Sequence, residues 1–498
     1  MLGVSVRLRE FFAFRSLWLD EVALLLQIRG RSYEALLSHG VAGNQGAPAA
    51  YLLLSKAAMS QFLSFEIGAR LVSFGCGIGA LFVAARLIMV AFQDTFTRSS
   101  SLLLVATSPW LIFYSAEGKH YMMETLVALV LVGCAMRYER ERLPMIAVVL
   151  VGAIAPWFSH NAPVVLCACG TLFIFRAWSR RDLRNVMLLV AMCGVWVVSF
   201  ALHAATNMRA LFGNSELFMY WRHGLAPWHD GFFAVVLWIG SVWGHLMEYV
   251  FMPPHYHASS ETSAPWWVSV WEIVLVALVV LGIIRMFRER SPLAPYVTLI
   301  LGVSFSLAIL RVSPFSSRLV LYTVPFFLMS AASGVAALVE RARGRGSLRA
   351  IGAIACALLV IGPSLATSAE RFVRPINRSN MKAALRYLAE VRSPDDLLLL
   401  RGVDATVAAM YIRRDPSLVM PVLDSKWKIV RPEVMCARLK KRMATFPGRA
   451  IWVVGILQAE EVSQALDELG RSCVVVTQRV ENDGFVAARI VAREASAN

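Results

Sequence analysis

Residues 184–204 read "RNVMLLVAMCGVWVVSFALHA", an apolar run whose only charged residue of fixed sign, Arg184, stands at its start. A helix needs about 20 predominantly apolar residues to cross the hydrocarbon core of a bilayer, and this run supplies them. The whole chain has the same character, because 58% of its 498 residues are hydrophobic and only 16% are charged. Such a composition excludes an ordinary soluble protein. The sequence therefore predicts a polytopic α-helical membrane protein.

Apolar runs of this kind recur between residues 68 and 367, and about ten of them qualify as transmembrane helices. A membrane domain is thus predicted at 68–367, between an N-terminal region of residues 1–67 and a tail of residues 368–498. The predicted spans are residues 68–93, 99–115, 120–137, 143–159, 162–178, 184–204, 266–286, 293–311, 318–340 and 348–367.

Much of the positive charge lies in the turns between these spans. A formal net charge of +16 could indicate nucleic-acid binding, but much of the arginine lies in every second turn, and the intervening turns are nearly free of Lys and Arg. By the positive-inside rule, the arginine-rich turns face the cytoplasm. Residues 1–67, the loop 205–265 and the tail 368–498 are then expected on the outer face of a bacterial-type plasma membrane.

Two further segments suit the outer membrane surface. The apolar stretch 231–252 would invert every later turn if it crossed the bilayer, so we expect it to lie on the outer face or to dip into it. Residues 21–37 mix a leucine-rich side with Arg29, Arg31 and Glu34, which predicts an amphipathic helix at the interface.

The tail after residue 367 has a different pattern. Helical stretches at 380–391, 404–412, 433–444 and 459–469 alternate with the β-type runs "DLLLLR", "SLVMP", "AIWVVG" and "CVVVTQ". This alternation predicts a small α/β domain with a mostly parallel sheet, without a glycine-rich phosphate loop or a nucleophile elbow. Cys436 and Cys473 lie in this domain and can form a disulfide if the tail faces an oxidising compartment.

Five short stretches of the chain, taken in order, form a recognisable pattern. They read "SLWLDE" from residue 16, "GAPAAYLLL" from 46, "ARLVSFGCGIGAL" from 69, "SPWLIFYSAEGKHYMMETL" from 108 and "RLVLYTVPFFLMSAASG" from 318. Together they resemble the GT-C superfamily of membrane glycosyltransferases. The likeness is to the branch that holds protein O-mannosyltransferases, the lipid A aminoarabinose transferase and the RgtA/B/C/D-like enzymes, with Lys119 in place of that branch's arginine.

The resemblance departs from this branch at the N-terminus. Residues 1–15 are too short and too basic to span a membrane, so the first helix of the family is missing from this position. Either this helix lies upstream of the recorded start, which we expect, or the amino terminus is translocated without a span of its own. The usual double proline is also reduced to Pro48.

The resemblance implies an inverting transfer of a sugar from a polyprenyl-phosphate donor to an acceptor at the outer face, the acceptor being a glycolipid, a cell-envelope glycan or a protein. It places Asp20 as the general base and Glu21 beside it, either orienting the acceptor or sharing a divalent cation. From spacing alone, Asp20 is equally an N-cap of the helix at 21–37, with Glu21 favoured by the helix dipole.

Cations near the predicted outer ends of spans are candidates for holding the donor phosphate. Lys119 and Arg318 are the first choices, with Tyr322 and Arg311 second. The alternative explanation for the basic residues is snorkelling of their long side chains toward lipid headgroups.

A divalent metal site is a further hypothesis. Glu117 and His120 flank Lys119, and His160 lies in the next outer turn, so that the three side chains offer oxygen and imidazole ligands. Histidines hydrated at the membrane interface are the alternative.

Two other functional classes stay open. A membrane oligosaccharide ligase or polymerase that uses a pyrophosphate-linked donor would place its key residues in a large late outer loop, and the loop 205–265 holds Arg209, Arg222, His223 and His229. A lipid-sugar flippase or transporter would carry charges inside its spans, whereas this sequence concentrates them at span ends. The sugar, the acceptor and the oligomeric state are not encoded in any motif of the sequence.

Overall fold

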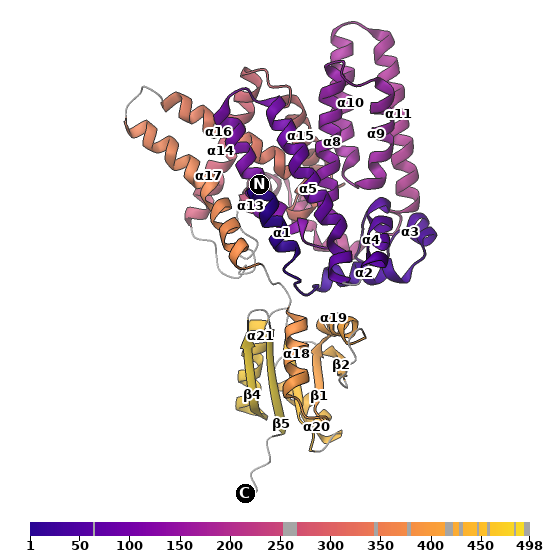
Figure 1. The fold of residues 1–498 in the computed structure, drawn as a ribbon, viewed down its shortest axis with the longest axis vertical. Helices are drawn as coiled ribbons and strands as arrows, with labels where there is room; N and C mark the ends of the chain where they lie inside the picture. The colour runs from indigo at the N-terminus through magenta and orange to yellow at the C-terminus, as the bar shows by residue number, and fades with distance from the viewer. Residues whose placement is uncertain are drawn as a thin grey trace. The chain divides into compact units, whose positions relative to one another are not determined.

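The computed structural model describes residues 1–62, 65–251, 266–342, 347–375, 380–413, 422–427, 432–445, 448–455, 459–482 and 485–492. The chain divides into two compact units (Figure 1). The helical unit contains Met1–Ala13 and Gln27–Pro375, and the α/β unit contains Phe14–Leu26 and Ile376–Asn498. The short segment Phe14–Leu26 therefore groups with residues far from it in sequence.

The N-terminal half of the helical unit consists of α1 (Leu2–Phe11), α3 (Tyr33–His39), α4 (Ala49–Gln61), α5 (Phe65–Ala91), α6 (Thr95–Thr107), α7 (Pro109–Ser115), α8 (Tyr121–Glu139), α9 (Met145–Phe158), α10 (Ala162–Ser179) and α11 (Leu183–Thr206). Helix α2 (Leu19–Gly30) crosses the boundary between the two units. The second half consists of α12 (Ser215–Tyr220), the 3-10 helices η1 (Arg222–Gly224) and η2 (Trp228–Asp230), α13 (Phe232–Phe251), α14 (Trp266–Arg288), α15 (Ala294–Ile309), η4 (Ser317–Thr323), α16 (Val324–Ala342) and α17 (Ser347–Val373).

The prediction of a polytopic helical membrane protein is confirmed. Within the part of the chain that the structure describes, eight helices are long and apolar enough to cross a membrane. They are Phe65–Ala91, Tyr121–Glu139, Ala162–Ser179, Leu183–Thr206, Phe232–Phe251, Val270–Arg288, Ser317–Ala342 and Ile354–Val373. Helices α9 and α15 are apolar but shorter.

Two segments differ from the sequence prediction. The expected span 99–115 forms two helices, α6 and α7, because Pro109 disfavours a helical conformation at Ser108, whose ψ is 121°. The stretch 231–252 forms the continuous helix α13, which belongs to the eight span-length helices. Its place on the outer face stays a prediction.

Two glycines allow α14 and α16 to approach each other closely. A Cβ added to Gly282 of α14 would lie 1.8 Å from the carbonyl oxygen of Ser330, and one added to Gly334 of α16 would lie 2.0 Å from that of Leu278. The two backbones can approach this closely only where side chains are absent, which is a common way to pack helices in a membrane. Helix α16 is consequently almost entirely buried.

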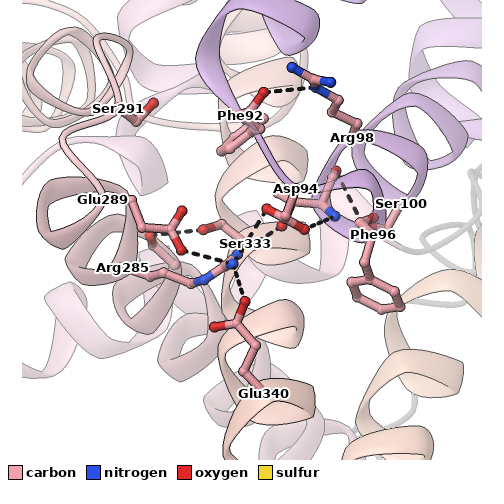
Figure 2. Close-up of polar contacts among 12 residues, drawn as sticks. Phe92, Asp94, Phe96, Arg98, Ser100, Arg285, Glu289, Ser291, Ser333 and Glu340 are labelled. Atoms are coloured by element: carbon pink, nitrogen blue, oxygen red, sulfur yellow. Dashed lines mark hydrogen bonds and ion pairs between the residues drawn. The ribbon is translucent and has the colours of Figure 1, made fainter.

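A buried arginine ties three segments together at one end of these helices, as Figure 2 shows. Arg285 of α14 contacts the carboxylates of Asp94, Glu289 and Glu340 at 3.4, 2.9 and 2.6 Å, and it donates a hydrogen bond to Thr97 at 2.7 Å. Burial opposes ionisation of Asp94, but hydrogen bonds from Thr97 and the charge of Arg285 outweigh it and lower the pKa of this carboxyl. The cluster thus joins the α5–α6 turn to α14 and α16.

The α/β unit is built around a five-stranded sheet with the order β2-β1-β3-β5-β4. Its elements are α18 (Met381–Val391), β1 (Leu397–Arg401), α19 (Gly402–Ile412), β2 (Val422–Trp427), α20 (Pro432–Thr445), β3 (Ile451–Gly455), α21 (Ala459–Ser472), β4 (Val474–Asn482) and β5 (Phe485–Ala492). Apolar residues of β1, β3, β5 and α21 form its core.

The predicted α/β domain is confirmed, with one correction to its sheet. Strands β2, β1 and β3 are parallel, but β5 is antiparallel to both β3 and β4, so the sheet is mixed rather than mostly parallel. Asn482 pairs with Phe485, and so short a connection cannot cross over to a parallel strand. The run "SLVMP" lies outside the described residues.

A disulfide and a buried carboxylate join separate elements of the α/β unit. Cys436 of α20 and Cys473 form a disulfide with Cα atoms 5.9 Å apart, as the sequence had left open. Asp396, almost fully buried, accepts two hydrogen bonds from Arg489 at 3.0 and 2.9 Å and one from the Trp452 indole at 3.0 Å. Although burial opposes its ionisation, these donors lower the pKa of Asp396.

Candidate functional site

A buried turn between α7 and α8 carries three ionisable side chains. Glu117, Lys119 and His120 are 1%, 3% and 7% exposed. The backbone N–H of Lys119 donates to the carbonyl of Glu117 at 2.7 Å, and the carbonyl of His120 accepts from Glu124 to begin α8. Burying so many ionisable groups is costly unless they are used or compensated, which marks this turn as a candidate site.

Lys119 is held by elements that precede it by many residues. Its ammonium donates to Oε1 of Gln45 at 2.6 Å, and its carbonyl accepts from the hydroxyl of Ser73 in α5 at 2.7 Å. The Ser73 hydroxyl in turn lies 3.3 Å from that of Tyr51 in α4. Gln45, in the segment before α4, thus holds the ammonium of Lys119, and α4 and α5 hold its backbone.

His120, Glu124 and His160 form a group that could hold a metal ion. One ligand atom from each lies within 4.8 Å of the others. The His120 Nε2 atom is 3.8 Å from Glu124 Oε1, and the same oxygen accepts the backbone N–H of His160 at 3.1 Å. The other oxygen of Glu124 accepts from the side chain of Asn161 at 2.8 Å. The first turn of α8 and the α9–α10 connection therefore build this group together.

This group differs from the predicted metal site at one position. Among the described residues, the carboxylate grouped with the two histidines is Glu124, and the predicted role of Glu117 stays a prediction. Residues four apart lie on one face of a helix, so that Glu124 follows His120 onto the same side of α8. The spacing of these two residues at the start of a predicted helix is a signal that sequence analysis could have used.

The electrostatics favour neutral imidazoles in this group. Burial lowers the pKa of His120 well below its ordinary value, and the charges of His160, Lys119 and Arg318 lower it further. Burial also lowers the pKa of His160 to about 3, with His203 contributing. Neutral imidazole is the form that binds metal ions.

The donor set and its unsatisfied atoms fit a metal. Two imidazoles and a carboxylate are a common ligand set for Zn²⁺. In the part of the chain that the structure describes, Nδ1 of His120 and Nε2 of His160 are buried without a hydrogen-bond partner. The ring centroid of His203 lies 5.5 Å from that of His160. No sequence motif had indicated His203.

Arg318 lies on η4 against aromatic rings. Its guanidinium carbon is 5.3 Å from the ring centroid of Trp221 and 5.9 Å from that of Tyr121. Such cation–π contacts position the guanidinium group. Tyr121 follows Lys119 and His120 directly in the chain, so the guanidinium of Arg318 lies close to the turn that carries them. The role of Lys119 and Arg318 toward a phosphate stays a prediction.

The second-choice phosphate ligands have other contacts. The Tyr322 hydroxyl is buried 2.8 Å from that of Ser304. Arg311 donates to the carbonyl of Ala226 at 3.1 Å and lies 3.3 Å from Nδ1 of His229. These contacts tie Arg311 to the loop before α13, and its role toward a phosphate stays a prediction.

The predicted acidic pair belongs to the α/β unit. Helix α2 begins at Leu19, so Asp20 lies inside its first turn and is not the N-cap. Glu21 is 1% exposed, and its carboxylate accepts the backbone N–H of Trp18 at 3.1 Å. Glu21 thus supplies the glutamate half of a capping box. The catalytic role of Asp20 stays a prediction.

Residues of the same unit hold the segment before α2. The backbone N–H of Leu17 donates to the Tyr411 hydroxyl at 2.8 Å, and the hydroxyl of Ser16 accepts from the backbone N–H of Lys382 at 3.0 Å. Both partners follow Leu17 by more than 360 residues in the chain, and no sequence pattern indicated them.

No protein-family model matches the sequence, and no curated protein matches it. Among solved structures, the chain is similar to ArnT from Cupriavidus metallidurans, both bound to undecaprenyl phosphate and in the apo state. Each comparison has a TM-score of 0.43 and 12% sequence identity, and it covers 98% of this chain and 97% of that chain.

Proposed function

We propose that this protein is an integral membrane glycosyltransferase that moves a sugar from a polyprenyl-phosphate donor to an acceptor, with inversion at the anomeric carbon. The observation that carries the proposal is the buried turn that holds Lys119 and His120: the guanidinium of Arg318 lies 5.9 Å from the ring of Tyr121, the next residue, in a unit built from span-length apolar helices. The apolar helices suit a lipid carrier, and two cations suit its phosphate.

The chemistry assigns each residue a step. The bond between the anomeric carbon and the phosphate oxygen breaks, and the electron pair leaves with the phosphate. Lys119 and Arg318 stabilise the negative charge that develops there. The acceptor hydroxyl forms the new bond from the opposite face of the sugar, and its proton passes to a carboxylate, for which we propose Asp20. Glu21 would act through the start of α2 as a positioning residue, in keeping with its hydrogen bond to Trp18.

The metal group would support the same step. We propose that His120, Glu124 and His160 hold a divalent cation, because their donor set and buried unsatisfied ring nitrogens fit one. Such a cation would add positive charge beside Lys119 and Arg318. The site would open on the outer face of a bacterial plasma membrane, and the acceptor would be a glycolipid, a cell-envelope glycan or a protein.

One observation favours a second candidate, a ligase or polymerase with a pyrophosphate-linked donor. The loop before α13 contacts the Arg318 region directly, because Trp221 covers the guanidinium and His223 Nε2 lies 2.9 Å from the Ser316 hydroxyl. Basic residues of this loop could accommodate a second phosphate. A flippase has no comparable support, since the ionisable groups gather in turns at the ends of helices.

The test compares donors in reconstituted vesicles that contain the full-length protein. Radiolabelled polyprenyl-monophosphate and polyprenyl-pyrophosphate sugars are offered with membrane extract as acceptor. We expect transfer from the monophosphate donor in the wild type and its loss in Asp20→Asn. The control is Asp182→Asn, which alters another aspartate at a helix start, where Asp182 caps α11. Asparagine caps equally well, so the control should keep transferring.

Three outcomes would contradict parts of the proposal. Transfer from the pyrophosphate donor alone would establish the ligase. Full transfer by Asp20→Asn would remove Asp20 as the base while leaving the enzyme class intact. Movement of labelled lipid across the vesicle membrane, without any transfer, would establish a flippase.

A further inference from the structure

A polar cavity lies at the opposite end of α8 from the candidate site. It has a volume of about 630 Å³ and lies where α8 and α10 end and α9 and α11 begin. These four helices stand side by side in Figure 1 and contact one another. Helix α8 has 19 residues, and a rise of 1.5 Å per residue puts its two ends about 28 Å apart. The cavity is therefore separate from the turn that holds Lys119.

Arginines give this cavity a positive balance. Arg142, Arg176 and Arg180 line it, together with Glu139 and Glu141. Arg176 forms an ion pair with Glu139. Within the described part of the chain, neither Arg142 nor Arg180 forms an ion pair. The guanidinium groups of Arg142 and Arg180 thus line a concave space. Of its two lining carboxylates, Glu139 is paired with Arg176 and Glu141 is not.

Apolar side chains lie both in the wall of the cavity and on the helix faces beside it. Phe173 and Leu189 form part of its wall and are buried. On the outer faces of α10 and α11 beside it, the side chains of Trp178, Leu183 and Met187 are more than half exposed. In a membrane protein, such exposed apolar side chains face the acyl chains of lipids. Guanidinium groups beside acyl chains mark the boundary between headgroups and hydrocarbon.

We propose that this cavity binds the headgroup of an anionic glycerophospholipid. The phosphodiester would accept hydrogen bonds from Arg142 and Arg180, because a planar guanidinium matches two phosphate oxygens. The acyl chains would follow the exposed faces of α10 and α11. Basic pockets between transmembrane helices bind anionic headgroups in this way. The bound lipid would hold the four helix ends together, whether or not the glycosyltransferase proposal is correct.

The test measures lipid binding to the full-length protein in detergent after removal of bound lipid. Phosphatidylglycerol and phosphatidylcholine with identical acyl chains are titrated and followed by native mass spectrometry. We expect one phosphatidylglycerol to bind at least about tenfold more tightly than phosphatidylcholine. The variant Arg142→Gln/Arg180→Gln should lose this preference. If the double variant does not fold, each single variant should lose part of it.

The matched control changes net charge equally outside the cavity. Arg137 and Arg184 are exposed residues near the same helix ends that do not line the cavity, so Arg137→Gln/Arg184→Gln should bind phosphatidylglycerol within about twofold of wild type. An equal loss in the control would show diffuse surface attraction and overturn the site. Displacement of the lipid by equimolar inorganic phosphate would show a site for soluble phosphate and overturn the lipid assignment.

Discussion

The side chain of Asn161 joins Glu124 to η4: its amide donates to the Glu124 carboxylate at 2.8 Å and to the carbonyl of Leu319 at 3.2 Å. Leu319 follows Arg318 directly. One amide thus links the carboxylate of the proposed metal group to the element that carries the proposed phosphate ligand, and it does so from the connection between α9 and α10.

Replacing this amide should disturb both groups. Asn161→Leu keeps the approximate volume but leaves one oxygen of the buried Glu124 carboxylate and the carbonyl of Leu319 without this donor, so we expect a loss of about 1–3 kcal/mol in the free energy of unfolding. Transfer activity should fall with it. Thermal unfolding and donor transfer measure the two effects. Unchanged transfer by a stable Asn161→Leu protein would contradict the link.

Metal content tests the ligand set. The purified wild type, incubated with Zn²⁺ and then dialysed, should retain about one equivalent by elemental analysis. Glu124→Gln and His160→Asn should retain little, because each removes a ligand of the group. Glu117→Gln should bind like wild type, since Glu117 lies outside the group. Retention by Glu124→Gln together with loss in Glu117→Gln would support Glu117 as the ligand instead.

Donor affinity separates the four proposed phosphate ligands. Lys119→Met and Arg318→Met should each weaken binding of polyprenyl phosphate by about tenfold or more, because each removes a charge-assisted hydrogen bond. Arg311→Met should have a smaller effect, since Arg311 contacts Ala226 and His229. Tyr322→Phe tests whether the hydroxyl beside Ser304 contributes. Wild-type affinity for polyprenyl phosphate in both Lys119→Met and Arg318→Met would refute the phosphate assignment.

The buried arginine of Figure 2 should dominate the stability of the helical unit. Arg285→Met leaves Asp94, Glu289 and Glu340 close together without their shared cation, and breaking a buried ion pair in this way costs about 3–5 kcal/mol. Thermal unfolding in detergent should show a large decrease in Tm. Arg288→Met changes an exposed arginine of the same helical turn and should leave Tm nearly unchanged. Similar shifts for the two variants would contradict a specific role for Arg285.

The α/β unit should lose stability in acid through Asp396. Burial by itself would raise the pKa of Asp396 in the folded unit, but hydrogen bonds from Arg489, Ser393 and Trp452 outweigh it and lower this pKa. A lowered folded pKa stabilises the unit fully above the unfolded value of about 3.9, and this stabilisation disappears as pH falls through the folded pKa. Hydrogen exchange of β3 amides in the full-length protein should accelerate over that range. Asp396→Asn should exchange faster at neutral pH and show a flatter acid dependence.

The sequence predicted much of the architecture because hydrophobic length and periodicity are local properties. The run 184–204 became α11 with little change, and the alternating tail became an α/β unit. Local sequence patterns did not predict features that depend on contacts between separate segments. The approach of α14 to α16 depends on Gly282 meeting Gly334, and the antiparallel β5 depends on its short connection to β4. Neither relationship is visible in a single segment.

For the candidate site, the sequence by itself determined which residue types are present and where charge is unusual: Lys119, His120 and Arg318 stood out because cations and imidazoles are costly near apolar spans. Only the tertiary structure decided which of them meet. It brought Glu124 and Asn161 to the group through hydrogen bonds between separate helices, and it placed Asp20 inside a helical turn instead of at its cap. Side-chain convergence depends on packing between distant segments, and packing is a property of the fold as a whole.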